Sequence, residues 1–248
     1  MRTVLITGTS RGIGLEFVRQ LALLQPGPEF IFASCRAPHH AKELQAIAAA
    51  HRNVKILEID VQDESTYGPA VETVSNLVGA MGLNVLINNA GIVFNESYET
   101  VSREVLFKLM DSNFISPLRL TQAFLPLLRQ GALSSPVDSF SVERGAVINM
   151  TSGLSSISEN TTEGHAGHRE SKAALNMFTK SLSLLLEGDK ILVVSQNPGY
   201  VKTDGGGPGA KITPQESVTV MLKIFSLLSE EYTGSFLAHR IPLQKCKF

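Results

Sequence analysis

Short apolar runs alternate with longer amphipathic stretches along most of the chain. The apolar runs have the length of buried β-strands and lie at residues 4–6, 29–34, 54–59, 83–88, 145–150, 191–196 and 235–238. The stretches with a helical spacing of apolar residues lie at 14–24, 39–51, 65–81, 102–110, 113–128, 168–186 and 214–228. Strands that alternate with helices in this order predict a parallel sheet covered on both faces. We therefore expect an α/β, Rossmann-type doubly wound fold, formed as a single domain by residues 1–248.

Two segments lack regular periodicity. Residues 131–144 are rich in serine and contain a proline, so they predict a surface loop. Residues 200–213 contain four glycines and directly follow the sixth predicted strand. Ligands of open α/β sheets bind beyond the carboxyl ends of the strands, so this second segment predicts a mobile lid over a ligand.

The connection between the first strand and the first helix carries the sequence TGTSRGIG at residues 7–14. Such a loop directs free backbone N–H groups and the positive end of a helix at a phosphate. Gly8 permits a tight turn, Gly12 lets the backbone approach a pyrophosphate, and Gly14 lets the helix pack closely on the sheet. The loop predicts dinucleotide binding, although a glycine loop alone is a weak signal.

The second strand ends in Ala33-Ser34-Cys35-Arg36 and offers no carboxylate. NAD-binding proteins usually place an acidic side chain there to bond the ribose hydroxyls. Arg36 can instead bind a 2′-phosphate, and Arg11 in the glycine loop can add a second positive charge. The pattern therefore predicts NADP(H) as the cofactor. The alternative is that both arginines are solvated surface residues.

Composition and charge argue against several other classes of function. The formal net charge of −1 gives no indication of a nucleic-acid or anionic-membrane partner. No apolar run reaches the roughly 18 residues that span a bilayer, and the sequence begins with a strand rather than a signal peptide. Its two cysteines, Cys35 and Cys246, are consistent with a reducing compartment. We expect a cytoplasmic protein with a small-molecule ligand, no metal site, no nucleic acid and no membrane.

The motifs and their order resemble those of the classical short-chain dehydrogenases/reductases. The matching pieces span nearly the whole chain and are residues 7–14, Asp60-Val61, Asn88-Asn89-Ala90-Gly91, Asn113, Ser152, Ser171-Lys172-Ala173-Ala174 and Asn197-Pro198-Gly199. Within that family, Cys35-Arg36 and residues 149–152 and 201–206 look most like the sniffer-type, or C-factor-like, carbonyl reductases. The resemblance implies an NADP(H) cofactor, a small carbonyl substrate and a possible homodimer or homotetramer.

The resemblance also implies which residues bind the cofactor. They are Gly8, Ser10, Arg11, Gly12, Ile13, Gly14, Arg36, Asp60, Val61, Asn89, Ala90, Gly91, Lys172, Pro198, Gly199, Val201 and Thr203. Asp60 is expected to meet the adenine amino group, with a strand-end cap as its alternative role. Thr203 is expected to bond the amide or phosphate of the cofactor, and Asn88 to brace the central strand.

Reduction of a carbonyl by hydride needs a proton donor, a group that holds the carbonyl oxygen and a cation that tunes the donor. In the family these are a tyrosine, a serine and a lysine, and an asparagine relays protons through water. The resemblance implies Ser152, Lys172 and Asn113 for the last three. The alternatives are an ordinary loop serine, an exposed helix lysine and a helix-capping asparagine.

The sequence departs from the family pattern at the position of the catalytic tyrosine. It should stand four residues before Lys172, on the same helix face, but His168 occupies that position and all four tyrosines lie elsewhere. Only imidazolium could donate a proton, and a charged Lys172 would lower its pKa. Carbonyl reduction should therefore weaken at neutral pH and favour lower pH, while alcohol oxidation could survive. His165 is a second candidate donor, although a loop histidine is more often solvated.

Two interpretations remain open. The first is an NADPH-dependent oxidoreductase that reduces aldehydes, ketones or quinones, with the proton coming from His168 or from water. The second is an NADP(H)-binding protein of the same fold with impaired or lost catalysis, acting as a sensor or interaction partner. The retained Ser152, Lys172 and Asn113 favour the first. The substrate pocket is expected from the loops at 92–98, 154–167 and 200–213.

Overall fold

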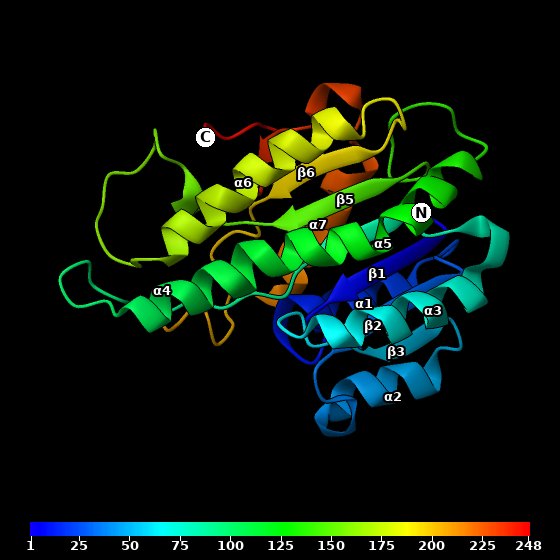
Figure 1. Ribbon diagram of the computed structural model, residues 1–248, viewed down its shortest axis with the longest axis horizontal. Helices are drawn as coiled ribbons and strands as arrows, with labels where there is room; N and C mark the ends of the chain where they lie inside the picture. The colour runs from blue at the N-terminus through cyan, green and yellow to red at the C-terminus, as the bar shows by residue number, and fades with distance from the viewer.

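The computed structural model describes all residues from Met1 to Phe248. The strands of the chain form one seven-stranded parallel sheet (Figure 1). The strands are β1 (Thr3–Thr7), β2 (Phe30–Cys35), β3 (Val54–Glu58), β4 (Val85–Asn88), β5 (Ala146–Met150), β6 (Leu192–Gln196) and β7 (Phe236–Leu237). Their spatial order is β3-β2-β1-β4-β5-β6-β7, so the direction of winding reverses between β1 and β4. Ligands of such sheets bind beyond the carboxyl ends of the strands at this reversal. The predicted doubly wound fold is confirmed.

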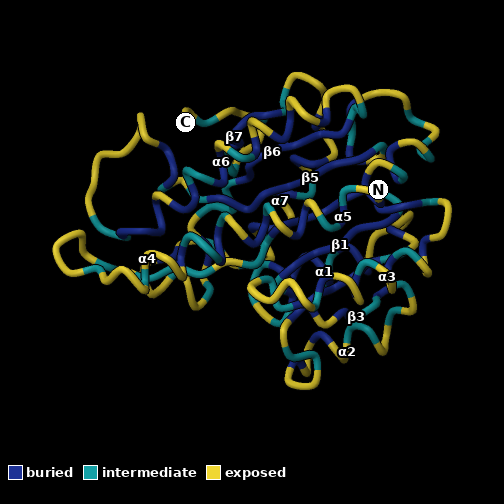
Figure 2. Tube along the Cα trace, in the orientation of Figure 1, coloured by how far each residue is buried: buried dark blue, intermediate teal, exposed yellow.

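Helices cover both faces of the sheet. The first face carries α1 (Gly12–Leu23), α2 (Lys42–Ala50) and α7 (Pro214–Ser226), and the second carries α3 (Tyr67–Val78), α5 (Ser116–Leu133) and α6 (His168–Leu185). Side chains alternate along a strand, so Val4 and Ile6 pack in the first core and Leu5 packs in the second. Figure 2 shows the central strands buried between these layers, while β3 at the edge of the sheet is only partly buried. None of the helices combines the length and apolar composition that crossing a bilayer requires.

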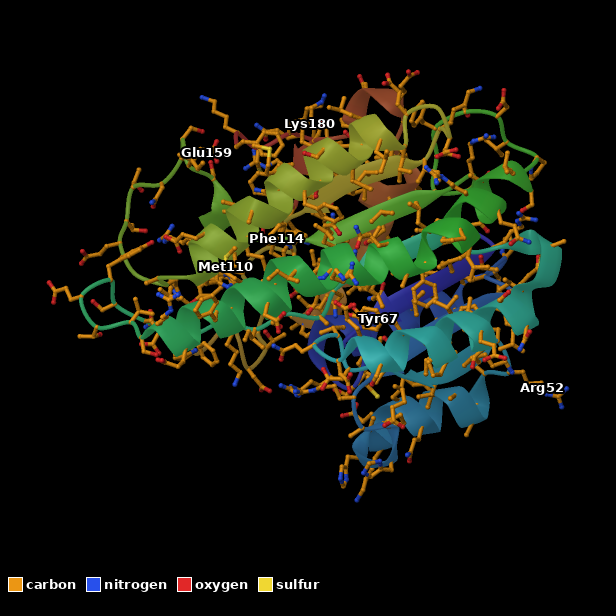
Figure 3. All side chains as sticks on the ribbon, viewed as in Figure 1. Arg52, Tyr67, Met110, Phe114, Glu159 and Lys180 are labelled. Atoms are coloured by element: carbon orange, nitrogen blue, oxygen red, sulfur yellow. The ribbon has the colours of Figure 1, made fainter.

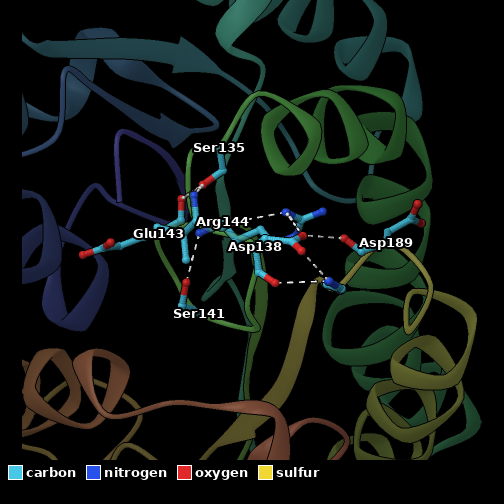
Figure 4. A network of polar contacts seen from close by, with 8 residues as sticks. Ser135, Asp138, Ser141, Glu143, Arg144 and Asp189 are labelled. Atoms are coloured by element: carbon cyan, nitrogen blue, oxygen red, sulfur yellow. Dashed lines mark hydrogen bonds and ion pairs between the residues drawn. The ribbon is translucent and has the colours of Figure 1, made fainter.

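Helix α5 is longer than predicted, so the loop expected at 131–144 begins later. Residues 131–133 are helical because Gly131 lets α5 pass against the backbone of residue 83. A Cβ at Gly131 would lie 2.2 Å from the carbonyl oxygen of Leu83, a distance that no larger residue tolerates. The rest of the loop is held by Arg144, whose guanidinium donates to the carbonyl oxygens of Val137 and Asp189 (Figure 4).

Helix α4 (Arg103–Met110) runs into α5 through a π-helical turn at Asp111–Ile115. The sequence predicts two separate helices with Asn113 at a boundary, and this detail is wrong. Figure 3 labels Met110 and Phe114 on the continuous stretch. A π turn accommodates one extra residue within a helix and occurs frequently at functional sites. Here it turns Asn113 fully into the interior, with no exposed surface.

Candidate active site

The candidate site is a long cleft beyond the carboxyl ends of the strands, the end to which the arrowheads point in Figure 1. It consists of two cavities of about 510 and 520 Å³. They are continuous because both are lined by Ile13, Asn89, Gly91, Ile92, Thr203 and Gly205. Every residue predicted to bind the cofactor lines one cavity or the other. The structure thus brings that set together, while the role of each member stays a prediction.

The glycine loop has the geometry that a phosphate requires. Gly8 has φ +70°, and a Cβ there would lie 2.9 Å from the Cα of Ala90. At Gly14 a Cβ would lie 2.3 Å from the carbonyl oxygen of Gly8, so the helix can approach only without a side chain. No side chain caps the N-terminus of α1, and its first turn holds no acidic residue. Its free N–H groups therefore face the cleft and fit an anion.

Positive charge gathers at one end of the cleft. Arg11 and Arg36 line the 510 Å³ cavity and also an adjoining cavity of about 430 Å³, which Lys42, His40 and one carboxylate, Glu43, line as well. The Nε of Arg11 lies 2.8 Å from a carboxylate oxygen of Asp204, in the predicted lid. Both partners of this ion pair are largely exposed, so it contributes little stability and Arg11 can exchange it for another anion. Together with Arg36, Arg11 fits a phosphate monoester.

The two alternative roles weighed for Asp60 both have a counterpart in the structure. Its Oδ1 accepts a hydrogen bond of 3.1 Å from the backbone N of Gln62, which is a local cap, and the residue also lines the cleft. Asn88 does brace the sheet, because its amide nitrogen donates to Asn149 at 2.8 Å and to Thr121 at 3.0 Å.

The other end of the cleft holds Ser152, Lys172 and His168. Ser152 follows β5, and its hydroxyl accepts from the backbone N of Leu154 at 3.2 Å. Lys172 is buried at 6% exposure, and its Nζ donates to the carbonyl oxygen of Met150 at 2.7 Å. It is therefore not the exposed helix lysine of the alternative interpretation. Burial lowers its pKa to about 8, which leaves it positively charged at pH 7.

Asn113 lies behind the cavity and is absent from its lining residues. Its Oδ1 accepts from the backbone N of Ile92 at 2.8 Å, and its Nδ2 donates to the Ile92 carbonyl at 2.9 Å and to the Ser171 hydroxyl at 3.0 Å. The alternative of a helix cap is wrong, since the residue sits within the π turn. These contacts hold the backbone of Ile92 in place, and the proton relay that the resemblance implies for Asn113 stays a prediction.

His168 stands at the first position of α6 and is 7% exposed. Its Nδ1 lies 3.3 Å from the same Ile92 carbonyl oxygen, a group that can only accept. The hydrogen therefore belongs on Nδ1, and Nε2 carries a lone pair. Burial, reinforced by the charge of Lys172, lowers the pKa of His168 to about 4. The direction expected from Lys172 agrees, but burial is the larger cause.

The lowered pKa of His168 predicts that the free energy of unfolding depends on pH. Between pH 4 and 6.5 the unfolded chain binds a proton at this residue that the folded chain does not, so stability falls as pH falls. Relative to His168→Phe, the native protein should lose about 2 kcal/mol of unfolding free energy from pH 7.5 to pH 5. Urea unfolding of both proteins at the two pH values measures this difference. An equal pH dependence in the two proteins would contradict the buried neutral imidazole.

Sequence reasoning missed one residue that shapes the cavity wall. Arg169 is 6% exposed and lies against the loop between β5 and α6, on which Figure 3 labels Glu159. Its guanidinium donates to the Gly164 carbonyl at 2.8 Å, to Asn160 Oδ1 at 3.0 Å and to the Thr162 hydroxyl at 2.8 Å. The sequence shows only that an arginine directly follows His168. The groups that this arginine binds lie in an irregular loop and follow no sequence pattern, so the contacts could not be predicted.

Comparison with known proteins agrees with this geometry. A sequence model of the short chain dehydrogenase family matches residues 2–210. The carbonyl reductase Sniffer of D. melanogaster is 38% identical, with both chains fully covered and a TM-score of 0.97. An NADPH-bound carbonyl reductase from chicken fatty liver is also 38% identical, with 100% of this chain and 99% of that chain covered and a TM-score of 0.94.

A further relative is similar to this chain in sequence. An uncharacterized oxidoreductase of Schizosaccharomyces pombe is 33% identical over 251 residues, which cover 93% of this chain and 92% of the relative. The chain therefore belongs to the classical short-chain dehydrogenases/reductases, as a sniffer-like member of that family.

Proposed function

We propose that this protein is an NADPH-dependent carbonyl reductase in which His168 stands in place of the usual catalytic tyrosine. The observation that carries the proposal is the continuous cleft, with Arg11 and Arg36 at one end and Ser152 and Lys172 at the other. Kinship with carbonyl reductases, one of them NADPH-bound, supports both the cofactor and the carbonyl substrate.

The residues of the cleft fit the cofactor from end to end. The arginines would hold the 2′-phosphate, the uncapped N-terminus of α1 the pyrophosphate, and Lys172 with residues 198–203 the nicotinamide half. When bound, the reduced nicotinamide supplies the hydride. The Ser152 hydroxyl would donate to the carbonyl oxygen, and the charge of Lys172 would stabilise the negative charge that develops there.

His168 leaves the site without an effective proton donor for carbonyl reduction at pH 7. With its hydrogen committed to Ile92 and its pKa near 4, the imidazole offers a lone pair rather than a proton at pH 7. A group of this kind serves alcohol oxidation as a base but does not serve reduction as an acid. The poor acidity of His168 favours the second candidate function. In this alternative, the chain is an NADP(H)-binding protein that has lost most catalysis and acts as a sensor or interaction partner.

A direct assay separates the two functions. NADPH binding is measured by fluorescence titration, and NADPH oxidation is followed with a panel of aldehydes, ketones and quinones from pH 5 to pH 9. We expect binding and slow, substrate-dependent oxidation that accelerates toward pH 5. Binding without any oxidation in the native protein or in His168→Tyr would favour the sensor, and absence of binding would contradict both candidates.

A further inference from the structure

A carbonyl reductase without an effective proton donor favours some carbonyls strongly over others. We propose that this site selects aryl carbonyls whose reduced oxygen is a weak base, namely those with strongly electron-withdrawing groups beside the carbonyl carbon. The inference rests on the proposed function and adds to it the class of substrate. Three observations support it: the state of His168, the other groups of the cavity and the way the substrate oxygen is stabilised.

His168 lines the cavity with a neutral imidazole that cannot donate to the substrate. Its one hydrogen is directed from Nδ1 at the Ile92 carbonyl oxygen, 3.3 Å away, so Nε2 carries a lone pair. The ring is only 7% exposed and Lys172 stands one helical turn away, so a positive charge on the imidazole is unfavourable. The proton must then come from water, which is a far weaker acid than the phenol of a tyrosine.

The other titratable groups of this cavity do not replace the missing donor. Its lining residues include no aspartate and no glutamate. The Nδ1 of His165 is buried without a hydrogen-bond partner, which disfavours an imidazolium there. The Tyr200 hydroxyl lies against Gly209 of the predicted lid, 2.8 Å from where a Cβ of that glycine would stand. The Nζ of Lys172 donates to the Met150 carbonyl at 2.7 Å, which holds the ammonium at the end of β5.

Ser152 and Lys172 stabilise negative charge on the substrate oxygen without removing it. The Ser152 hydroxyl can donate a hydrogen bond to that oxygen, and Lys172 supplies positive charge. The apolar side chains of Ile92, Leu154 and Val201 line the same cavity and fit an aryl group. A transition state in this site keeps most of the charge that a tyrosine would neutralise. The rate therefore depends strongly on how well the substrate itself bears that charge.

The proposed step balances in atoms and charge. The carbonyl carbon accepts the hydride that NADPH supplies, and the pair of C=O π electrons moves onto the oxygen. The oxyanion is paired with the Lys172 ammonium and takes its proton from water, which leaves hydroxide for the solvent to neutralise. A trifluoromethyl group or a second carbonyl beside the reacting carbon withdraws electrons and makes this oxyanion a weaker base. Such a substrate needs less help from an acid than a simple aryl ketone does.

The test compares two ketones with the same aryl group, acetophenone and 2,2,2-trifluoroacetophenone, at pH 7. The preformed complex of each protein with NADPH is mixed with ketone, and the first turnover is followed, so product release does not contribute. The proteins are the native chain, His168→Tyr and the matched control His168→Phe, which has the shape of tyrosine but no hydroxyl. The two ketones differ in size and hydration, and this difference cancels when the tyrosine and phenylalanine variants are compared.

We expect His168→Tyr to reduce acetophenone about 10²-fold faster than the native protein does, but trifluoroacetophenone less than about 10-fold faster. His168→Phe should keep the native preference for the fluorinated ketone, because neither of these proteins has a donor at position 168. The Kd of NADPH, from fluorescence titration, should be nearly unchanged in both variants.

Two outcomes would overturn the inference while leaving the proposed function intact. One is an equal gain for both ketones in His168→Tyr, because it would show that the basicity of the oxyanion does not limit the native site. The other is the same preference in His168→Phe as in His168→Tyr, because the preference would then follow from shape. Native protein that binds NADPH but reduces neither ketone would overturn the proposed function itself, and the inference with it.

Discussion

Replacing His168 with tyrosine should raise kcat for carbonyl reduction at pH 7 by about 10²-fold. The phenol reaches farther into the cavity than imidazole and carries a proton that it can donate. Lys172, one helical turn away and positively charged at pH 7, would lower the pKa of that phenol and make it a better acid. General acids contribute typically about 10²–10⁴-fold, and this range sets the scale of the expected gain.

The matched control for this substitution is His168→Phe, which has nearly the same shape as tyrosine but no hydroxyl. The Ile92 carbonyl keeps its hydrogen bond from Asn113 in either variant, so the loop it belongs to should remain in place. NADPH oxidation with one aldehyde at pH 7 compares the three proteins. A native rate equal to that of His168→Tyr, or an increase shared by His168→Phe, would show that His168 does not limit reduction.

Replacing Arg36 with aspartate should weaken NADPH binding by about 100-fold and make NADH the better ligand. Arg36 is exposed at the end of β2, where a 2′-phosphate would lie, and a guanidinium can bind such a group through two parallel hydrogen bonds. Hydrogen bonds to charged groups contribute about 1.5–3 kcal/mol each, and aspartate adds repulsion of the phosphate. It also restores the carboxylate that bonds the ribose hydroxyls of NAD.

Arg52→Asp is the control for the change in net charge. Figure 3 shows Arg52 projecting away from the cleft at the edge of the molecule, so its substitution should leave both affinities unchanged. Fluorescence titrations of NADPH and NADH against the three proteins measure the ratio of the two dissociation constants. Equal losses in Arg36→Asp and Arg52→Asp, or no loss in either, would contradict a 2′-phosphate site at Arg36.

Local patterns predicted most of the fold. The strands and helices read from hydrophobic periodicity occur in the expected order, because in a parallel sheet each buried strand is a continuous apolar run. The errors lie where a long-range contact overrides the pattern. Gly131 looked like the start of a loop, yet it is the residue that lets α5 pass over the Leu83 backbone. The π turn around Asn113 gives no periodic signal of its own.

The site was predictable where residue type and spacing determine it. The glycine loop, Arg36, Ser152 and Lys172 could all be located because each function needs that residue at a fixed distance from a strand or helix. The tautomer of His168 could not be predicted, since it depends on the carbonyl oxygen of Ile92, which is 76 residues away in sequence. The partners of Arg169 and the buried Nδ1 of His165 were equally out of reach, because they follow from the path of an irregular loop.

Transfer of a labelled hydride tests the central claim most directly. The native protein and His168→Tyr are incubated with 4-nitrobenzaldehyde and NADPH deuterated at C4 on one face or the other, at pH 5 and at pH 7, and the alcohol is analysed by mass spectrometry. We predict deuterium at the carbinol carbon from one face only, with more product at pH 5 than at pH 7 for the native protein. NADPH that binds but yields no labelled alcohol with either protein at either pH would contradict a carbonyl reductase.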